Sequence, residues 1–343
     1  MKIIFLYNHP HPVHGAWAES IYADFQQDRV LKIKLPGISR LVKSLITWIK
    51  LPKDAEIVLC ESSSQLIAGS LWKHFNRKKK LVCIMSDPKW YYLQNKKLSR
   101  SLYYWMLKQA DLLIPTSPLM KSFIPEEMQA KASIVFPYVN VKQYAGGSNS
   151  LKKHAIIFTG RVGYEKGADL ALKAFQLIKE EVSDAKIYFV GFGDLKESLE
   201  NKKIKDAIFA GWSNAPQDYY KKGSICLSLA RIDPAGIAPL EAMLSGLIPV
   251  VSQGVGNAYI VEKLDKKLIA KDEEDAAQKI IAIWKNKKLM QQYAKRGREI
   301  AKQYGYGESV KIFQNAMKQI GVKGFRKITQ KEAEKYRPTT KPY

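Results

Sequence analysis

Residues 231–252 read RIDPAGIAPLEAMLSGLIPVVS, a stretch that holds the start of a helix, its end and the strand that follows. Pro239 suits the first turn of a helix, and Gly246 suits the position just after its last residue. The run IPVVS is a short apolar segment of the kind that forms a buried parallel strand. Asp233 and Glu241 place one carboxylate before this helix and another inside it, which calls for a chemical explanation.

Short apolar or β-branched runs alternate with helical patterns along most of the chain. In the first half, the predicted strands are KIIFLY (2–7), AEIVLC (55–60), LVCIM (81–85), LLIPT (112–116) and SIVFP (133–137). In the second half, they are AIIFTG (155–160), KIYFVG (186–191), AIFAGW (207–212), SICLSLA (224–230) and IPVVS (248–252). Strands separated by helices indicate βαβ units, so each half is predicted to be an α/β domain with a doubly wound parallel sheet.

The polar, glycine-containing stretch 142–154 interrupts this alternation and predicts a linker. A length of 343 residues fits two domains of ordinary size. We expect an N-terminal domain over 1–145 and a C-terminal domain over 154–303. A helix over 304–322 is expected to pack back on the N-terminal domain, and the basic residues 323–343 to form a mobile tail.

The formal net charge of +24 predicts an anionic partner, which can be a nucleic acid, an anionic membrane surface or a phosphate-bearing substrate. No acid occurs between Asp28 and Asp54, where the segment ISRLVKSLITWIK (38–50) has the pattern of a basic amphipathic helix. Four of its residues are candidates for docking on a membrane: Arg40, Lys43, Trp48 and Lys50. The alternative is a surface helix that buries its apolar residues in the protein's own core.

The chain has no apolar run of about 18 residues and no signal-peptide pattern at its start, so a cytoplasmic location is expected. Cys60, Cys83 and Cys226 stand alone inside apolar runs, which predicts buried thiols without a chemical role.

The loops after the predicted strands carry the informative residues, because open parallel sheets bind ligands at the carboxyl ends of their strands. After IIFTG, the segment RVGYEKGAD holds Arg161 and Lys166, with Gly160 at its edge. Two cations on such a loop can neutralise a diphosphate, although a solvated basic loop is the alternative. After KIYFVG, Gly191 and Gly193 permit a close approach of the backbone or a simple tight turn.

The helix that begins near Gly236 and Ile237 would point backbone amides at any phosphate beside it. Asp233 and Glu241 could then accept hydrogen bonds from sugar hydroxyls. The alternative is that Asp233 caps the helix and Glu241 offsets its dipole.

Several motifs in the right order resemble the nucleotide-sugar domain of retaining glycosyltransferases with the GT-B fold, family 4. They are TGRVGYEKGAD, VGFGD and the run from AGWSN to AYIVE, within residues 154–300. The resemblance implies two Rossmann-like domains that face a central cleft, and a hexose transferred from a UDP- or GDP-sugar. It also implies that Arg161 and Lys166 bind the donor diphosphate together with the amides at Gly236 and Ile237.

The family's Glu-x7-Glu motif maps onto Asp233 and Glu241, which implies that Asp233 holds hydroxyls of the donor sugar and Glu241 the ribose. The sequence departs from the pattern in having Asp at the first acid and Ala235 where a Phe is common. The shorter side chain draws the carboxylate back by about 1.5 Å, which leaves the donor sugar open.

The N-terminal half offers fewer signals. The loop NHPHPVHGAW contains His9, His11 and His14, but without an accompanying carboxylate or Cys a metal site is not expected. His14 and Gly15 are instead candidates for the cleft that receives the acceptor. Asp87, in SDPKWYY after a predicted strand, is the candidate polar partner of the acceptor, with a turn-forming Asp-Pro as the alternative.

The predicted enzyme therefore needs no metal or other cofactor, and its acceptor is a lipid-linked or cell-surface glycan. Two alternatives remain from the sequence. A catalytically silent relative would bind nucleotide or glycan, and a nucleic-acid-binding protein would need a basic stripe with stacking aromatics but no paired acids.

Overall fold

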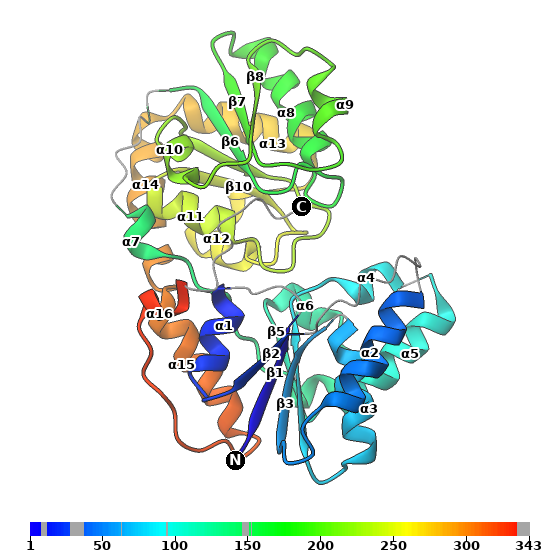
Figure 1. Cartoon of the computed structure of the whole chain (residues 1–343). Helices are drawn as coiled ribbons and strands as arrows, with labels where there is room; N and C mark the ends of the chain where they lie inside the picture. Colours follow the sequence, from blue (N-terminus) through cyan, green and yellow to red (C-terminus); the bar gives the residue numbers. More distant parts are fainter. Residues whose placement is uncertain are drawn as a thin grey trace. The chain divides into compact units, whose positions relative to one another are not determined.

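The computed structural model describes residues 1–7, 12–27, 38–62, 64–93, 95–145, 151 and 153–334, with the backbone alone at 12, 25–27, 38–40 and 333–334. The contacts divide the chain into two units. The first comprises residues 1–136 and 307–343, and the second comprises residues 137–306. Each unit contains a parallel sheet with helices packed against it (Figure 1).

The sheet of the first unit has the strand order β2-β1-β3-β4-β5. Its strands are β1 (Ile3–Tyr7), β2 (Asp24–Gln27), β3 (Ile57–Glu61), β4 (Lys80–Met85) and β5 (Leu112–Pro115). Its helices are α1 (Pro12–Glu19), α2 (Ile38–Lys50), α3 (Ser64–Phe75), α4 (Lys89–Leu93), α5 (Lys97–Gln109), α6 (Pro118–Ser122), α15 (Tyr306–Lys318) and α16 (Gln330–Glu334). Helices α2, α3 and α5 cover one face of this sheet, and α1 and α15 cover the other (Figure 1).

The sheet of the second unit has the order β11-β10-β9-β6-β7-β8. Its strands are β6 (Ala155–Thr159), β7 (Lys186–Val190), β8 (Ala207–Gly211), β9 (Ile225–Ser228), β10 (Ile248–Ser252) and β11 (Ile269–Ala270). Its helices are α7 (Val141–Tyr144), α8 (Ala168–Glu181), α9 (Lys196–Glu200), α10 (Pro216–Tyr220), α11 (Ile237–Ser245), α12 (Ala258–Leu264), α13 (Glu273–Trp284) and α14 (Lys287–Lys302). The chain crosses from β6 to β7 on one side of the sheet and from β9 to β10 on the other. Because such crossovers are right-handed, α8 and α11 lie on opposite faces of the sheet.

Most of the predicted strands are present, but residues 133–137 do not form one. The amides of Ser133 and Val135 donate to the carbonyls of Leu113 and Pro115 on β5, at 2.9 and 3.1 Å. One parallel bridge joins Leu113 to Ala132, but Pro115 has no N–H with which to donate back, so the pairing does not continue along the segment. This segment lies beside the sheet without joining its ladder. The three cysteines are buried as predicted, and burial together with Glu241 raises the pKa of Cys226 to about 12.

The linker begins later than predicted, because residues 141–144 form α7 and pack into the second unit. Tyr144 is buried, its ring lies 5.9 Å from that of Tyr220, and its carbonyl accepts a hydrogen bond from Ser245 Oγ. The rest of the predicted linker lies mostly outside the described residues.

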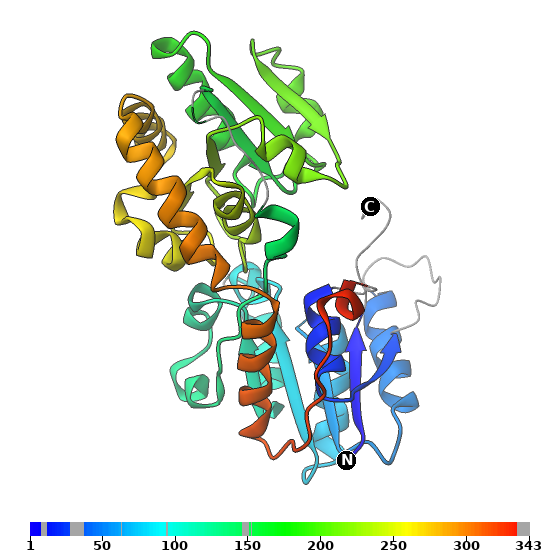
Figure 2. The same ribbon diagram turned by 90° about the vertical axis from the view of Figure 1, so that its left-hand side faces the viewer.

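The end of the chain packs against the first unit in Figure 2, where α15 and the segment after it run beside α1. Trp17 of α1 stacks on Phe313 of α15, with ring centroids 5.4 Å apart, and donates to Ser309 Oγ at 3.1 Å. Arg326 pairs with Glu19 at 3.0 Å, so part of the segment predicted to be a mobile tail is held against α1. Residues 335–343 of that segment lie outside the described residues.

Candidate functional site

The strand order of the second unit reverses between β6 and β9, since the chain proceeds to β7 on one side and to β10 on the other. The loops that leave β6 and β9 therefore diverge, and this is the position where open parallel sheets bind ligands. The β6–α8 loop contains Arg161 and Lys166, and the β9–α11 loop contains Asp233 and Gly236. The fold thus brings four of the predicted site residues to neighbouring loops.

Lys166 and Asp233 form an ion pair between these two loops, with Lys166 Nζ 2.7 Å from Asp233 Oδ2. The Lys166 side chain is 30% exposed and that of Asp233 is 13% exposed, so the pair is open to solvent mainly from the lysine side. Asp233 Oδ1 also accepts a hydrogen bond from the Gly236 amide at 3.0 Å. The N-cap of α11 is Gly236, which has no side chain, so Asp233 holds the turn before the helix and does not cap its first turn, contrary to one reading of the sequence. Its other oxygen holds the lysine.

Glu241 lies on the second turn of α11 and accepts a hydrogen bond from the Tyr220 hydroxyl at 3.1 Å. Tyr220 is fully buried at the end of α10. Burial and the neighbouring Glu241 hold the pKa of Tyr220 well above its usual value, so the hydroxyl keeps its proton and acts as a donor. The sequence pattern does not indicate this partner, because strand β9 separates α10 from α11 along the chain.

Ile237 is the first residue of α11, and Gly236 precedes it with φ of 66°, in the left-handed region. A Cβ atom on Gly236 would lie 2.4 Å from Val255 Cγ1. The glycine therefore lets the start of α11 pack against the segment after β10 and keeps its first amides beside Asp233.

Arg161 is the most exposed of the predicted donor-binding side chains, at 61%. Its guanidinium lies 3.6 Å from Asp194 on the loop after β7, an exposed ion pair that contributes little stability. Arg161 can therefore turn toward a ligand at small cost, whereas Lys166 must first release Asp233.

Gly160, Gly191 and Gly193 bring the loops after β6 and β7 into backbone contact. A Cβ on Gly191 would lie 1.9 Å from the Gly160 carbonyl oxygen, and one on Gly193 would lie 2.1 Å from that of Val162. The Val162 amide donates to the Phe192 carbonyl at 2.8 Å. Both glycines thus have a packing role between the loops that is sufficient to explain them.

Arg231 fixes the two central loops to each other, a role that the sequence analysis missed. Its guanidinium forms two 2.8 Å hydrogen bonds with the carboxylate of Asp169, at the start of α8. It also lies over the Tyr164 ring, 3.8 Å from the centroid, and donates to the Tyr164 carbonyl. Arg231 stands two residues before Asp233 in the sequence, which could have suggested a role in the site. Its partner Asp169, however, is set by the fold.

In the first unit, His14 and Glu61 meet at the corresponding reversal of strand order, between β1 and β3. His14 Nδ1 lies 2.8 Å from Glu61 Oε1, and both side chains are largely buried. His14 and Gly15 lie within α1, where Gly15 is buried as well. The loop NHPHPVHGAW has no carboxylate of its own, and the fold supplies one to His14 from the end of β3. His9 and His11 lie outside the described residues.

Asp87 lies on the loop after β4, half-exposed, and its carboxylate is 3.3 Å from Lys89 Nζ. The Lys89 amide also donates to the Asp87 carbonyl at 2.8 Å, which is the geometry of a local turn. The turn-forming role is present, and a role toward an acceptor stays a prediction.

Helix α2 forms as predicted. Its buried side is not the one expected if all its apolar residues faced the protein's own core. Ser44 and Thr47 are buried, and Ser44 Oγ donates to the Ser64 carbonyl at 2.9 Å, while Leu41 is 51% and Ile49 74% exposed. Trp48 is half-buried and stacks on Phe75, with centroids 5.4 Å apart. Lys43 is half-exposed and Lys50 is exposed, and the Arg40 side chain lies outside the described residues.

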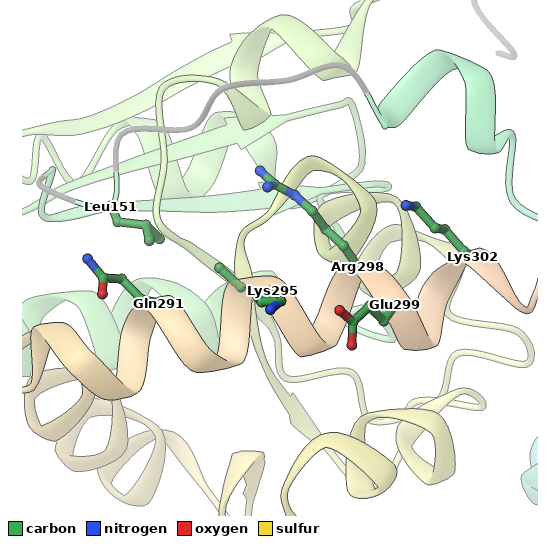
Figure 3. A pocket seen from close by; sticks show the side chains of 7 residues that line it. Leu151, Gln291, Lys295, Arg298, Glu299 and Lys302 are labelled. Carbon is green, nitrogen blue, oxygen red and sulfur yellow. The ribbon is translucent and has the colours of Figure 1, made fainter.

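A cavity of about 280 Å³ lies away from these loops, along α14 (Figure 3). Arg298 reaches from its wall to the C-terminal end of α11 and donates to the Ser245 carbonyl at 3.3 Å, where a cation stabilises the helix. Within the described ranges, no group of three His, Cys, Asp or Glu side chains could hold a metal ion. None of the described helices is both long and apolar enough to cross a membrane.

Curated relatives are glycosyltransferases. A poly(glycerol-phosphate) alpha-glucosyltransferase of Bacillus subtilis is 23% identical over 209 residues, which cover 56% of this chain and 30% of that protein. An uncharacterized glycosyltransferase of Haemophilus influenzae is 22% identical over 303 residues, which cover 83% of this chain and 82% of that protein. This chain spans between 30% and 46% of the length of each of the first three curated relatives.

Solved structures share the fold of both units. Sucrose-phosphate synthase from Thermosynechococcus elongatus superposes with a TM-score of 0.77 at 13% identity, covering 93% of this chain and 99% of that one. Anabaena HepE in complex with UDP and glucose gives a TM-score of 0.71 at 14% identity, with the same coverage. The family model described as glycosyl transferases group 1 matches residues 143–300. The chain therefore has the GT-B fold, and its second unit matches the family model of glycosyl transferases group 1.

Proposed function

We propose that the protein is a retaining glycosyltransferase that moves a hexose from a UDP- or GDP-sugar to a lipid-linked or cell-surface glycan. The observation that carries the proposal is the Lys166–Asp233 pair at the start of α11, at the reversal of strand order. A cation beside helix-terminal amides is suited to a diphosphate, and the adjacent carboxylate is suited to hydroxyls. The glycosyltransferase relatives support the same reaction class.

The chemical task is to stabilise the negative charge that develops on the departing nucleoside diphosphate. Lys166, Arg161 and the first amides of α11 would supply this stabilisation without proton transfer. When the diphosphate takes Lys166, Asp233 loses its cation and can accept a hydroxyl of the sugar. Glu241, held by Tyr220, would accept from the ribose. Retention at the anomeric carbon follows the family and is tested by NMR of the first product formed.

Replacing Lys166 with Ala tests the proposal. We expect kcat/KM with a panel of UDP- and GDP-sugars, beginning with UDP-glucose, to fall by about 100-fold or more, because one charged donor to the leaving group is lost. The fold should persist, since an ion pair that is open to solvent adds little stability. Donor hydrolysis and transfer assays, with a melting curve beside them, provide the measurements.

Lys173→Ala is the matched control. Lys173 lies on α8 and makes an exposed 3.4 Å pair with Glu273, so the same change there should leave turnover unaltered. Equal activity in Lys166→Ala and the native chain would refute the role of Lys166. A native chain that binds nucleotide-sugars but transfers and hydrolyses none would favour the catalytically silent relative.

We also propose that α2, α3 and α5 dock the protein on an anionic membrane that presents the acceptor. Large apolar side chains are exposed on these helices, with Phe75 at 66% and Leu98 at 85% in addition to Leu41 and Ile49. Lys43 and Lys50 of α2 supply cations on the same helix. Exposed apolar side chains beside cations are suited to the boundary between lipid headgroups and acyl chains.

Cosedimentation with vesicles of phosphatidylglycerol or phosphatidylcholine tests this docking. We expect binding to phosphatidylglycerol that weakens as salt rises, and weaker binding for Lys43→Gln/Lys50→Gln and for Ile49→Ser. The control Lys287→Gln/Lys288→Gln changes charge equally on α14. Binding that is lost equally in the control, or absent at low salt, would rule the docking surface out.

Gel shifts with single-stranded DNA and RNA at physiological salt address the nucleic-acid alternative.

A further inference from the structure

A second cavity lies at the opposite edge of the second sheet, where β6 and β7 begin. Its volume is about 600 Å³, within the range of small-molecule sites. Three separate segments converge on it: the start of β6, the start of β7 with the turn before it, and the turn after α10. The lining residues are Lys153, His154, Ala155, Asp184, Lys186, Tyr188 and Lys222.

The cavity carries three lysines against one carboxylate. Asp184 is already engaged, since its Oδ1 lies 2.8 Å from His154 Nδ1, and this bond is the main reason that its pKa lies below the usual value. Among the described residues, Lys153, Lys186 and Lys222 have no ion-pair partner. Lys186 also acts on Asp206, outside the cavity, and helps to lower the pKa of that carboxyl. The positive charge of the concave surface is therefore compensated only in part, and a bound anion would compensate it further.

Tyr188 lines the cavity, and Tyr219, which does not line it, also contacts Lys222. Lys222 Nζ lies 4.6 Å from the centroid of the Tyr219 ring and 5.7 Å from that of Tyr188. The two rings are 6.3 Å apart. The cation–π contacts hold the ammonium group against the wall instead of leaving it free in solvent.

We propose that this cavity binds a phosphorylated sugar or polyol. Three ammonium groups act as point charges for a phosphate, and no metal is required for that contact. The volume exceeds what a phosphate alone would fill, so the carrier has room beside the Tyr188 ring. A neutral sugar would leave the positive charge of the three lysines uncompensated, which makes the phosphate group the recognised element.

The site is separate from the proposed donor site. Strand β6 has five residues, with Ala155 at the cavity and the Arg161 loop beyond its other end. At about 3.3 Å per residue, the two sites are on the order of 16 Å apart. The inference goes beyond the proposed function and does not depend on it.

Isothermal titration of the full chain at low salt tests the proposal, with glucose 6-phosphate and glucose as probes. We expect glucose 6-phosphate to bind and glucose not to bind. Lys153→Gln/Lys186→Gln should weaken the binding of glucose 6-phosphate by about tenfold, because two of three cations are lost. Lys295→Gln/Lys302→Gln is the control, since these lysines line the cavity of Figure 3 and the change in charge is the same.

The binding of UDP separates this result from the proposed function. UDP affinity should be unchanged in Lys153→Gln/Lys186→Gln, and glucose 6-phosphate should still bind to Lys166→Ala. Displacement of glucose 6-phosphate by UDP would overturn the proposal, because the ligand would then occupy the donor loops. Equal weakening in the control pair, equal binding of glucose, or no binding at low salt would overturn it as well.

Discussion

Two ion pairs connect the same two loops, and their geometry assigns them different roles. Lys166 approaches Asp233 with a single 2.7 Å contact and retains solvent access. Arg231 makes a bidentate contact with Asp169 and lies against Tyr164, which leaves it few donors for a ligand. Lys166 is therefore the cation that is available to the proposed donor diphosphate, and Arg231 is the residue that keeps the two loops in place.

The Arg231–Asp169 pair predicts a stability difference that depends on pH. Burial alone would raise the pKa of Asp169, but the hydrogen bonds and charge of Arg231 outweigh it, and the net pKa is lowered. A carboxyl with a lowered pKa in the folded state stabilises the fold above its unfolded pKa of about 3.9 and loses this contribution as the pH falls through the folded value.

Asp169→Asn should therefore reduce the free energy of unfolding by about 2 kcal/mol at pH 7. The gap between the native chain and the variant should narrow as the pH falls below about 4, where the unfolded chain takes up its proton, and it should close only below the lower folded pKa, where Asp169 is protonated in both states. Urea titrations of the two proteins from pH 7 to pH 3.5 measure the gap. A gap that stays constant across this range would mean that Arg231 does not act through the charge of Asp169.

At this scale the sequence indicates which residue types lie on the loops of the candidate site but not their partners. Asp233 and Lys166 were both selected from loops that follow strands, and the fold brings them into contact. No spacing rule indicates Tyr220 or Asp169, because their contacts join segments that are distant in the sequence. The same limit applies to Glu61, whose position beside His14 depends on the pairing of β1 with β3.

At the scale of elements, glycines decide how closely the helices approach the strands. Gly167 precedes α8 with φ of 66°, and a Cβ there would lie 1.9 Å from the Leu229 carbonyl oxygen. That contact joins the start of α8 to the loop after β9, which is part of the candidate site. Gly307, near the start of α15, has no atom within 4 Å of an added Cβ.

Gly167→Ala and Gly307→Ala should consequently change stability in opposite directions. The first forces a methyl group into backbone and a left-handed φ, and should cost at least about 2 kcal/mol. The second removes backbone freedom from the unfolded chain within a helix and should add about 0.5–1 kcal/mol. Denaturant unfolding of both variants measures this. Equal and small effects at the two positions would contradict the close approach at Leu229.

The elements themselves were largely predictable from local pattern, especially those of the second unit, where β10 and the end of α11 fall where the strand run and Gly246 indicate. The exceptions have non-local causes. Strand β2 pairs with β1, but its residues Asp24–Gln27 carry no apolar pattern. The buried side of α2 is formed by Ser44 and Thr47, because small side chains allow it to lie close to α3. Of the apolar residues in the predicted pattern, Trp48 packs against the core, whereas Leu41 and Ile49 are exposed.

At the scale of the whole molecule, the chain leaves the first unit after residue 136 and returns to it at residue 307. The return completes the core on the α1 side of the first sheet. Trp17, Ser309 and Phe313 are each fully buried, and Ser309 Oγ donates to the Phe136 carbonyl at 2.6 Å. Losing the partner of a buried Trp is comparable with a large-to-small core substitution, about 3–5 kcal/mol. That is a large share of the stability of a domain.

A fragment of residues 1–136 should therefore fail to fold alone, whereas the same fragment joined to residues 307–343 should fold. A short Gly/Ser linker suffices, because the bond from Ser309 to Phe136 places the two ends together. We expect cooperative urea unfolding and little dye binding for the joined fragment, and strong binding of a hydrophobic dye for residues 1–136. The fragment 137–306 should unfold cooperatively without residues 1–136 or 307–343, since it forms a compact unit of its own. Identical unfolding curves for the first two fragments would mean that α15 only covers the first unit and does not complete its core.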